Sequence, residues 1–97
     1  MTHYVYTFWA GDRALYVGCT NNLARRGSDH EPMPWSRRAD LLSWEAFPNR
    51  AEGLAAEAAR IVELEPVYNK RGNPAFKRYM KANRYRLVNW PPAGEVA

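Results

Sequence analysis

Two short segments on either side of Gly11-Asp12 constrain the fold of this chain more than any other feature. Residues 3–9 read HYVYTFW and residues 14–19 read ALYVGC. Runs of β-branched and aromatic residues around such a glycine turn are typical of a β-hairpin. A turn at this position pairs residues whose numbers sum to about 22, which predicts that Tyr6 lies opposite Tyr16 on one face of the sheet.

A third strand and three helices are expected after the hairpin. The first helix begins near Leu23, with Thr20 or Asn21 as its cap. The segment 41–47 (LLSWEAF) favours the third strand, and residues 74–84 (PAFKRYMKANR) favour a basic helix. The order β-β-α-β-α-α therefore predicts an α/β (α+β) domain in which helices flank a small mixed three-stranded sheet.

The clearest helix covers about residues 49–65. Asn49 and Glu52 have the spacing of a capping box, and Pro66 cannot continue a helix. Its buried side is expected to follow one line of residues and a neighbouring flank: Leu54, Ala58, Ile61 and Glu65, then Ala55 and Val62. Glu57 lies about 60° to the other side of that line, at about 100° per residue, and is therefore expected to border the buried stripe.

Five elements in this order resemble the motifs of the GIY-YIG nuclease family. They are Tyr4-Val5-Tyr6; Tyr16-Val17-Gly18; a segment from Thr20 and Leu23 to Arg25-Arg26, with His30 four residues later; Glu57 within a helix; and Pro66, Tyr68 and Asn69. The resemblance covers roughly residues 3–71, about three quarters of the chain. Tyr4 stands where the family's motif has a glycine, and Gly27 follows Arg26 directly.

The resemblance implies a GIY-YIG-like fold and a metal-dependent endonuclease that hydrolyses the phosphodiester bonds of DNA by a one-metal mechanism. The residues at the matching positions would form the active site: Tyr6, Tyr16, Arg26, His30 and Glu57, with Gly18 and Asn69 in support. Glu57 is the one carboxylate in this set. A single Mg²⁺ or Mn²⁺ ion is therefore expected, bound by Glu57 and otherwise by water and the substrate phosphate.

The chemistry of these side chains leaves the proton acceptor open. Arg26 suits a phosphate because its planar guanidinium stays charged and can bind two oxygens at once. Tyr6 could act as general base while Tyr16 orients the water. A free tyrosine titrates near ~10, so this role requires Arg26 or the metal to favour the phenolate. His30, which titrates near ~6.5 when unperturbed, could relay the proton instead.

Basic residues are concentrated near the C-terminus. The formal net charge is +4, and residues 70–86 hold seven basic side chains and no acidic one. They are Lys70, Arg71, Lys77, Arg78, Lys81, Arg84 and Arg86. Such a block favours a polyphosphate partner, so these residues, together with Arg25, are expected to bind DNA. A solvated helix face is the alternative interpretation.

We expect residues 1–71 to form the catalytic domain, residues 72–86 to form a basic helical segment packed on it, and residues 87–97 to form a loose terminus. The chain has no apolar run of the ~18–20 residues that a membrane span needs, and its start lacks the basic residues of a signal peptide. A lone cysteine, Cys19, excludes an internal disulfide. These features predict a cytoplasmic protein without a membrane partner, in a bacterial cell or a phage-infected host. Sequence specificity is expected from the basic segment, from DNA structure or from a partner protein.

Each site residue also has a purely structural interpretation. The two tyrosines could be a cross-strand aromatic pair, Arg26 and His30 could be exposed helix residues, and Glu57 could be the ion-pair partner of Arg50 or Arg60. For the whole chain, the alternatives are a non-catalytic nucleic-acid-binding module and a phage adaptor protein. A module that only binds has no need of Glu57, and an adaptor leaves the basic segment unexplained.

Overall fold

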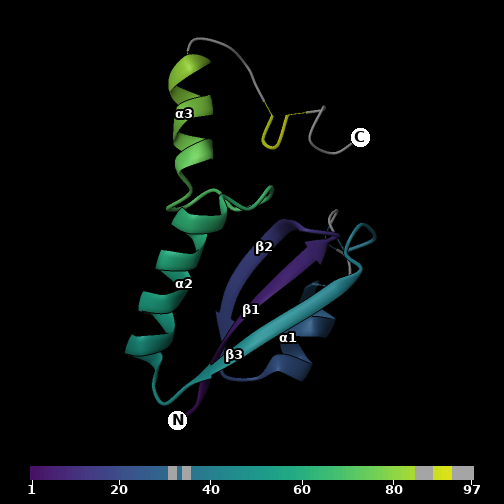
Figure 1. Ribbon diagram of the computed structural model, residues 1–97, viewed down its shortest axis with the longest axis vertical. Helices are drawn as coiled ribbons and strands as arrows, with labels where there is room; N and C mark the ends of the chain where they lie inside the picture. Colours follow the sequence, from purple (N-terminus) through teal and green to yellow (C-terminus); the bar gives the residue numbers. More distant parts are fainter. Residues whose placement is uncertain (31–32, 34–35, 85–88, 93–97) are drawn as a thin grey trace.

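A single three-stranded sheet, in the order β2-β1-β3, forms the centre of the molecule. The computed structural model describes residues 1–30, 33, 36–84 and 89–92, with the backbone alone for residues 27–30. The elements follow the chain as β1 (His3–Ala10), β2 (Arg13–Thr20), α1 (Leu23–His30), β3 (Leu41–Phe47), α2 (Arg50–Leu64) and α3 (Pro74–Ala82) (Figure 1). The predicted α+β class and element order are confirmed. Within the described ranges, no helix combines the length and the apolar character that crossing a membrane requires.

Both strand pairs are antiparallel, so the expectation of a mixed sheet is wrong. β2 ends beside the start of β1, because Thr20 pairs with Tyr4. β3 begins at the opposite end of β1, where Leu41 pairs with Trp9. The chain between them, which includes α1, therefore returns along the sheet before β3 begins, and β3 runs antiparallel to β1.

The hairpin forms around Gly11-Asp12 as predicted, but the predicted pairing of Tyr6 with Tyr16 is wrong by two residues. Tyr6 pairs with Gly18 and Tyr16 pairs with Phe8. The pairs next to the turn, such as Ala10 with Arg13, lie one residue from the predicted register, and an irregularity after Phe8 adds the second residue. A shift of two residues leaves each side chain on its original face. Tyr6 and Tyr16 therefore still share a face, with ring centroids 6.4 Å apart.

Gly18 leaves room for the Tyr6 ring on β2. A Cβ atom at position 18 would lie within 3.0 Å of three atoms of the Tyr6 phenol, including its hydroxyl oxygen. Tyr6 is only 2% exposed, so its ring cannot move into solvent without losing its packing. Since β2 is an edge strand, the bare backbone at position 18 lets the phenol reach the outer edge of the sheet.

The helices α1 and α2 lie on opposite faces of the sheet (Figure 1). On one face, Ile61 of α2 packs against Val5 and Val17 in the hydrophobic core. On the other face, Arg26 of α1 donates a hydrogen bond to the hydroxyl of Tyr6. The sheet therefore separates the two helices, and only its edges give side chains from both faces a place to meet.

Asparagine side chains cap the starts of α1 and α2, and a left-handed residue ends α2. Asn49 accepts a hydrogen bond from the backbone N–H three residues on (2.9 Å), as predicted for α2. Asn22 caps α1 in the same way (3.1 Å), so the prediction that Thr20 or Asn21 is the cap is wrong. Thr20 instead accepts a hydrogen bond from the backbone N–H of Asn22 (3.1 Å), which shapes the turn into α1. At the C-terminus of α2, Glu65 adopts the left-handed conformation, with φ of 45°.

The packing face of α2 differs from the predicted line. Gly53 and Ile61 are buried, whereas Leu54 and Val62 are 42% and 56% exposed. A Cβ atom at Gly53 would lie 3.1 Å from side-chain atoms of β1 and β2, so the missing side chain lets α2 approach the sheet closely here. At about 100° per residue, Glu57 lies midway between Gly53 and Ile61 on the helix, in the middle of the packing face.

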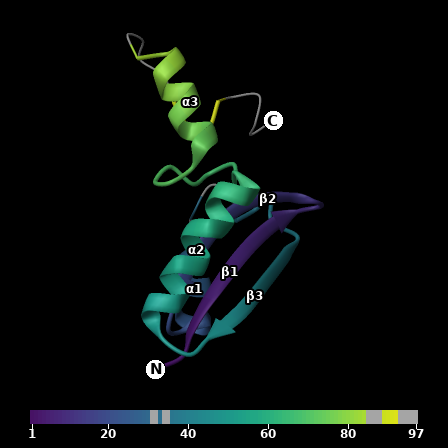
Figure 2. The same ribbon diagram turned by 60° about the vertical axis from the view of Figure 1, so that its left-hand side comes forward.

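The helix α3 stands apart from the sheet, beyond the C-terminal end of α2 (Figure 2). None of its residues is buried. Phe76 and Tyr79 each contact the ring of Trp90, with centroid distances of 5.4 Å. The helix ends at Ala82 instead of the predicted residue 84. Residues 85–88, which include the predicted DNA-binding Arg86, and 93–97 of the expected loose terminus lie outside the described residues.

We predict that Gly18→Ala lowers the free energy of unfolding by about 1–3 kcal/mol, because the new methyl group overpacks the site against the Tyr6 ring. In a Tyr6→Leu background, Gly18→Ala should lower the free energy of unfolding markedly less, since the shorter leucine side chain leaves space for the new methyl group. Urea denaturation of the four proteins of this cycle measures the coupling. Equal costs in both backgrounds would show that the Tyr6 ring does not depend on Gly18.

Candidate active site

The outer edge of β2 faces a cavity of about 780 Å³, which the sheet shares with α2 and the loop after α2. β2 contributes Tyr16 and Val17, α2 contributes Glu57 among others, and the loop contributes the five residues from Tyr68 to Gly72. Five of the residues predicted from the sequence, two catalytic, one supporting and two DNA-binding, therefore line a single cavity.

Asn69 closes the middle of the β2 edge. Its side-chain oxygen accepts a hydrogen bond from the N–H of Val17 (2.8 Å), and its side-chain nitrogen donates one to the Val17 carbonyl (3.0 Å). The backbone N–H groups of Val67 and Tyr68 bond to the same strand nearer the turn. Asn69 is buried, and its contacts align the loop with β2 directly beside Tyr16.

Arg26 connects the two faces of the sheet at this edge. It donates a hydrogen bond to Tyr6, and its charge opposes the rise in pKa of Tyr6, Tyr16 and Glu57. The two tyrosines belong to the α1 face, whereas Glu57 comes from α2 on the opposite face. One guanidinium therefore acts electrostatically on side chains from both faces. Four of the five predicted catalytic residues lie together, and the side chain of the fifth, His30, lies outside the described residues.

Burial raises the pKa of both tyrosines in this group. The neighbouring Tyr16 raises the pKa of Tyr6 further, while Arg26 opposes the rise by its charge and its hydrogen bond. Burial outweighs Arg26 at both residues, so both hydroxyls keep their protons at neutral pH. Arg26 alone therefore does not favour the Tyr6 phenolate, which was one of the two conditions for Tyr6 to act as general base.

The carboxylate of Glu57 is only partly compensated by its neighbours. Burial raises its pKa above the ordinary value of 4.5, and the charges of Arg26 and Arg71 oppose that rise without cancelling it. Arg60 is not its ion-pair partner, because the Arg60 guanidinium bonds to the Glu45 carboxylate on β3 at 2.7 Å. A further positive charge in the cavity would therefore stabilise ionised Glu57.

This donor set fits one hard divalent cation. Glu57 is the one carboxylate among the residues that line the cavity. Among the residues that the structure describes, no group of three or more His, Cys, Asp or Glu side chains is arranged to hold a metal ion. Mg²⁺ is commonly bound by one or two carboxylates, with water and substrate phosphates at its other positions. Glu57 at an open cavity matches that kind of site.

The predicted DNA-binding residues divide into two groups. Lys70 and Arg71 line the cavity that contains Glu57, and Arg25 lines a neighbouring cavity together with Arg26. The second group lies on α3 or just after it, away from the sheet: Lys77, Arg78, Lys81 and Arg84.

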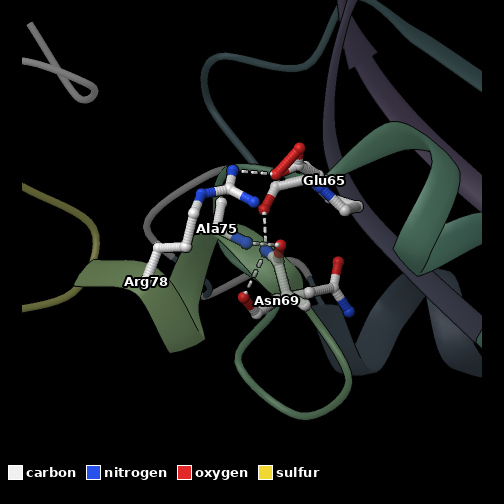
Figure 3. Close-up of polar contacts among 6 residues, drawn as sticks. Glu65, Asn69, Ala75 and Arg78 are labelled. Atoms are coloured by element: carbon white, nitrogen blue, oxygen red, sulfur yellow. Dashed lines mark hydrogen bonds and ion pairs between the residues drawn. The ribbon is translucent and has the colours of Figure 1, made fainter. Parts of the chain in front are cut away.

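Arg78 is held against the end of α2. Figure 3 shows its guanidinium at the carboxylate of Glu65. Beside this pair, the buried Asn73 donates hydrogen bonds to the carbonyls of Pro66 (2.8 Å) and Asn69 (2.9 Å), and it accepts one from the N–H of Ala75 (3.0 Å). These contacts tie α3 to the loop that lines the cavity. They also pair the charge of Arg78 within the protein, which reduces what it can offer to DNA.

Sequence reasoning missed the position of Arg50. This residue lines both the cavity of Glu57 and the cavity of Arg25 and Arg26, and within the described part of the chain it forms no salt bridge with Glu57. The signal was present, because Arg50 precedes Glu57 by seven residues. That spacing is close to two helical turns, so both lie on one face of α2.

Comparisons with known proteins give one partial similarity. A UPF0213 protein encoded in the ldhD 5′ region of Pediococcus acidilactici is 34% identical to this chain over 62 residues. The match covers 56% of this chain and 63% of that relative, so the chain spans less than two thirds of its length. No family model and no solved structure matches the chain. The relative's name states no activity, substrate or ligand.

In protein kept free of divalent metal, we predict that Glu57→Gln raises the melting temperature at neutral pH. A carboxyl whose pKa is raised by folding adds stability below pH 4.5 and loses it as the pH rises through the raised value, so the ionised group is unfavourable at pH 7. The gain from the substitution should shrink as the pH falls through that range. Thermal melts across pH 4–8 test this, with the exposed Glu63→Gln on the same helix as control. A lower melting temperature for Glu57→Gln at pH 7 would contradict it.

Proposed function

We propose that this chain is a metal-dependent DNA endonuclease whose active site lies at the outer edge of β2. The observation that carries the proposal is the position of Arg26, which hydrogen-bonds Tyr6 and acts electrostatically on Tyr16 and Glu57. A phosphate-binding cation, a partly compensated carboxylate and a protonated hydroxyl suit the hydrolysis of a phosphodiester. Glu57 and Tyr16 line the larger cavity, and Arg26 lines the cavity that adjoins it.

The sequence supports the same function. The ordered motifs resemble those of GIY-YIG nucleases. Four residues at the matching positions act on one another electrostatically: Tyr6, Tyr16, Arg26 and Glu57. UPF0213 is itself a GIY-YIG-like family, so the partial similarity to a UPF0213 protein agrees with this resemblance. The similarity supports the family resemblance, and the chemistry of the site supports the activity.

In the proposed reaction, Arg26 binds the scissile phosphate with its guanidinium and stabilises the charge that develops on the phosphate oxygens. Glu57 would hold one Mg²⁺ or Mn²⁺ ion, which when bound supplies an activated water and neutralises charge on the phosphate. Tyr16, which lines the cavity, keeps its proton and donates a hydrogen bond to the phosphate or to the attacking water, and the buried Tyr6 positions the guanidinium of Arg26. Asn69 holds the loop after α2 against β2, and Gly18 leaves space for the ring of Tyr6.

A purified preparation should nick supercoiled plasmid in Mg²⁺ or Mn²⁺, and EDTA should stop the reaction. Glu57→Gln and Arg26→Ala should each lower the nicking rate by about 10²-fold or more, because each removes a group that stabilises charge in the transition state. Glu63→Gln removes an exposed carboxylate of the same helix and serves as the matched control.

The melting temperatures of all variants should be measured beside these rates, so that a loss of activity is not confused with unfolding. Retained activity in folded Glu57→Gln and Arg26→Ala would refute the proposed site. Salt-sensitive DNA binding without metal-dependent nicking by the unaltered protein would favour a non-catalytic nucleic-acid-binding module instead.

A further inference from the structure

A second cavity adjoins the proposed active site. It has a volume of about 330 Å³ and lies where the end of β2 meets the first turns of α1 and α2. Its charged lining residues are three arginines, Arg25, Arg26 and Arg50, and no carboxylate lines it. Arg50 and Leu54 line both this cavity and the cavity of Glu57, so the two are neighbours along α2.

Arg50 is the cation that the proposed reaction does not use. Its side chain is exposed, and it forms no hydrogen bond or ion pair with any residue that the structure describes. Its charge acts on the thiol of Cys19, opposing the rise in pKa that burial causes there. Since Cys19 also lines the second cavity, the guanidinium lies close to that cavity.

The other arginine on α2 behaves differently. Arg60 lies ten residues farther along the helix, and its guanidinium is bonded to Glu45. Arg78 on α3 is paired with Glu65 in the same way. An arginine that already has a carboxylate partner gains less from a phosphate than one without a partner, so Arg50 is the stronger candidate for an external anion.

The spacing along α2 relates this cation to the proposed reaction centre. Arg50 and Glu57 are seven residues apart on one helix face, which places their backbones about 10 Å apart along the helix axis. One strand of duplex DNA advances about 3.4 Å per nucleotide along its own axis. Neighbouring phosphates of one strand lie farther apart than this rise, because the strand also winds around the axis. A strand that runs along α2 would therefore bring a phosphate to Arg50 about one or two nucleotides from the one at Glu57.

We infer that the part of this cavity lined by Arg25 and Arg50, next to Arg26 at the scissile phosphate, is a second phosphate subsite, which binds a phosphate of the cleaved strand about one or two nucleotides from the scissile one. This inference rests on the proposed function and adds the path of the substrate. The DNA strand runs along α2, from the Arg50 cavity past Glu57 to Lys70 and Arg71, and α3 lies outside this path.

The salt dependence of DNA binding tests this subsite. The protein carries Glu57→Gln to prevent cleavage, and a fluorescent duplex of 20 base pairs is titrated in EDTA at several salt concentrations. Adding Arg50→Ala should weaken binding to every duplex sequence and reduce the slope of log K against log salt by about 0.9, the value for one lost phosphate contact. Adding Arg60→Ala removes the same charge from the same helix and should leave the slope unchanged.

The result that overturns the inference is an Arg50→Ala slope equal to that of its parent, or equal reductions for Arg50→Ala and Arg60→Ala. In either case metal-dependent nicking by the unaltered protein would still stand, so the two proposals fail separately. Absence of measurable duplex binding by the parent protein would also overturn the subsite, while nicking by the unaltered protein would still decide the proposed function. Where nicking occurs at a mapped position, a neutral methylphosphonate about one or two nucleotides from it should slow the unaltered protein and have no further effect on Arg50→Ala.

Discussion

The contact between the Tyr6 ring and the bare backbone of Gly18 determines where a site can form in this molecule. A sheet keeps the side chains of its two faces apart, and here α1 and α2 cover opposite faces (Figure 1). Position 18 lies on the edge strand β2, and without a side chain there the phenol of Tyr6 extends to that edge. Arg26 of α1 can then donate a hydrogen bond to Tyr6, and its charge also acts on Glu57, which comes from α2 on the opposite face.

The charges at this edge favour the binding of a cation at the expense of the stability of the folded chain. Burial raises the pKa of Tyr6, Tyr16 and Glu57, and Arg26 opposes the rise at each of them without reversing it. The carboxylate of Glu57 is therefore less stable in the folded chain than in solvent, and a cation would relieve that cost. Two other carboxylates are paired within the protein: Glu45 with Arg60 and Glu65 with Arg78.

Features with local signals could be predicted from the sequence. The glycine turn marks the hairpin, the Asn49 cap and Pro66 delimit α2, and the β-rich run 41–47 forms β3 as predicted. The pairing of Tyr6 was not predictable, because the irregularity after Phe8 depends on how the two strands pack. The shared face of the tyrosines was predictable, since an error of two residues preserves it.

The packing face of α2 and the role of Arg50 depend on tertiary contacts. Alanines occur on several sides of α2, so the apolar pattern alone was compatible with a packing face rotated away from Glu57. The close approach at Gly53 selects the face that is used. Arg50 looked like an ion-pair partner of Glu57, and only the arrangement of the two cavities shows that it lies between them.

A crystal structure of the Glu57→Gln protein bound to a short DNA duplex would test the central claim most directly. The account predicts a backbone phosphate on the guanidinium of Arg26 at the β2 edge, with the side chain at position 57 facing the same phosphate. A duplex bound along α3, with no phosphate near Arg26, would contradict it.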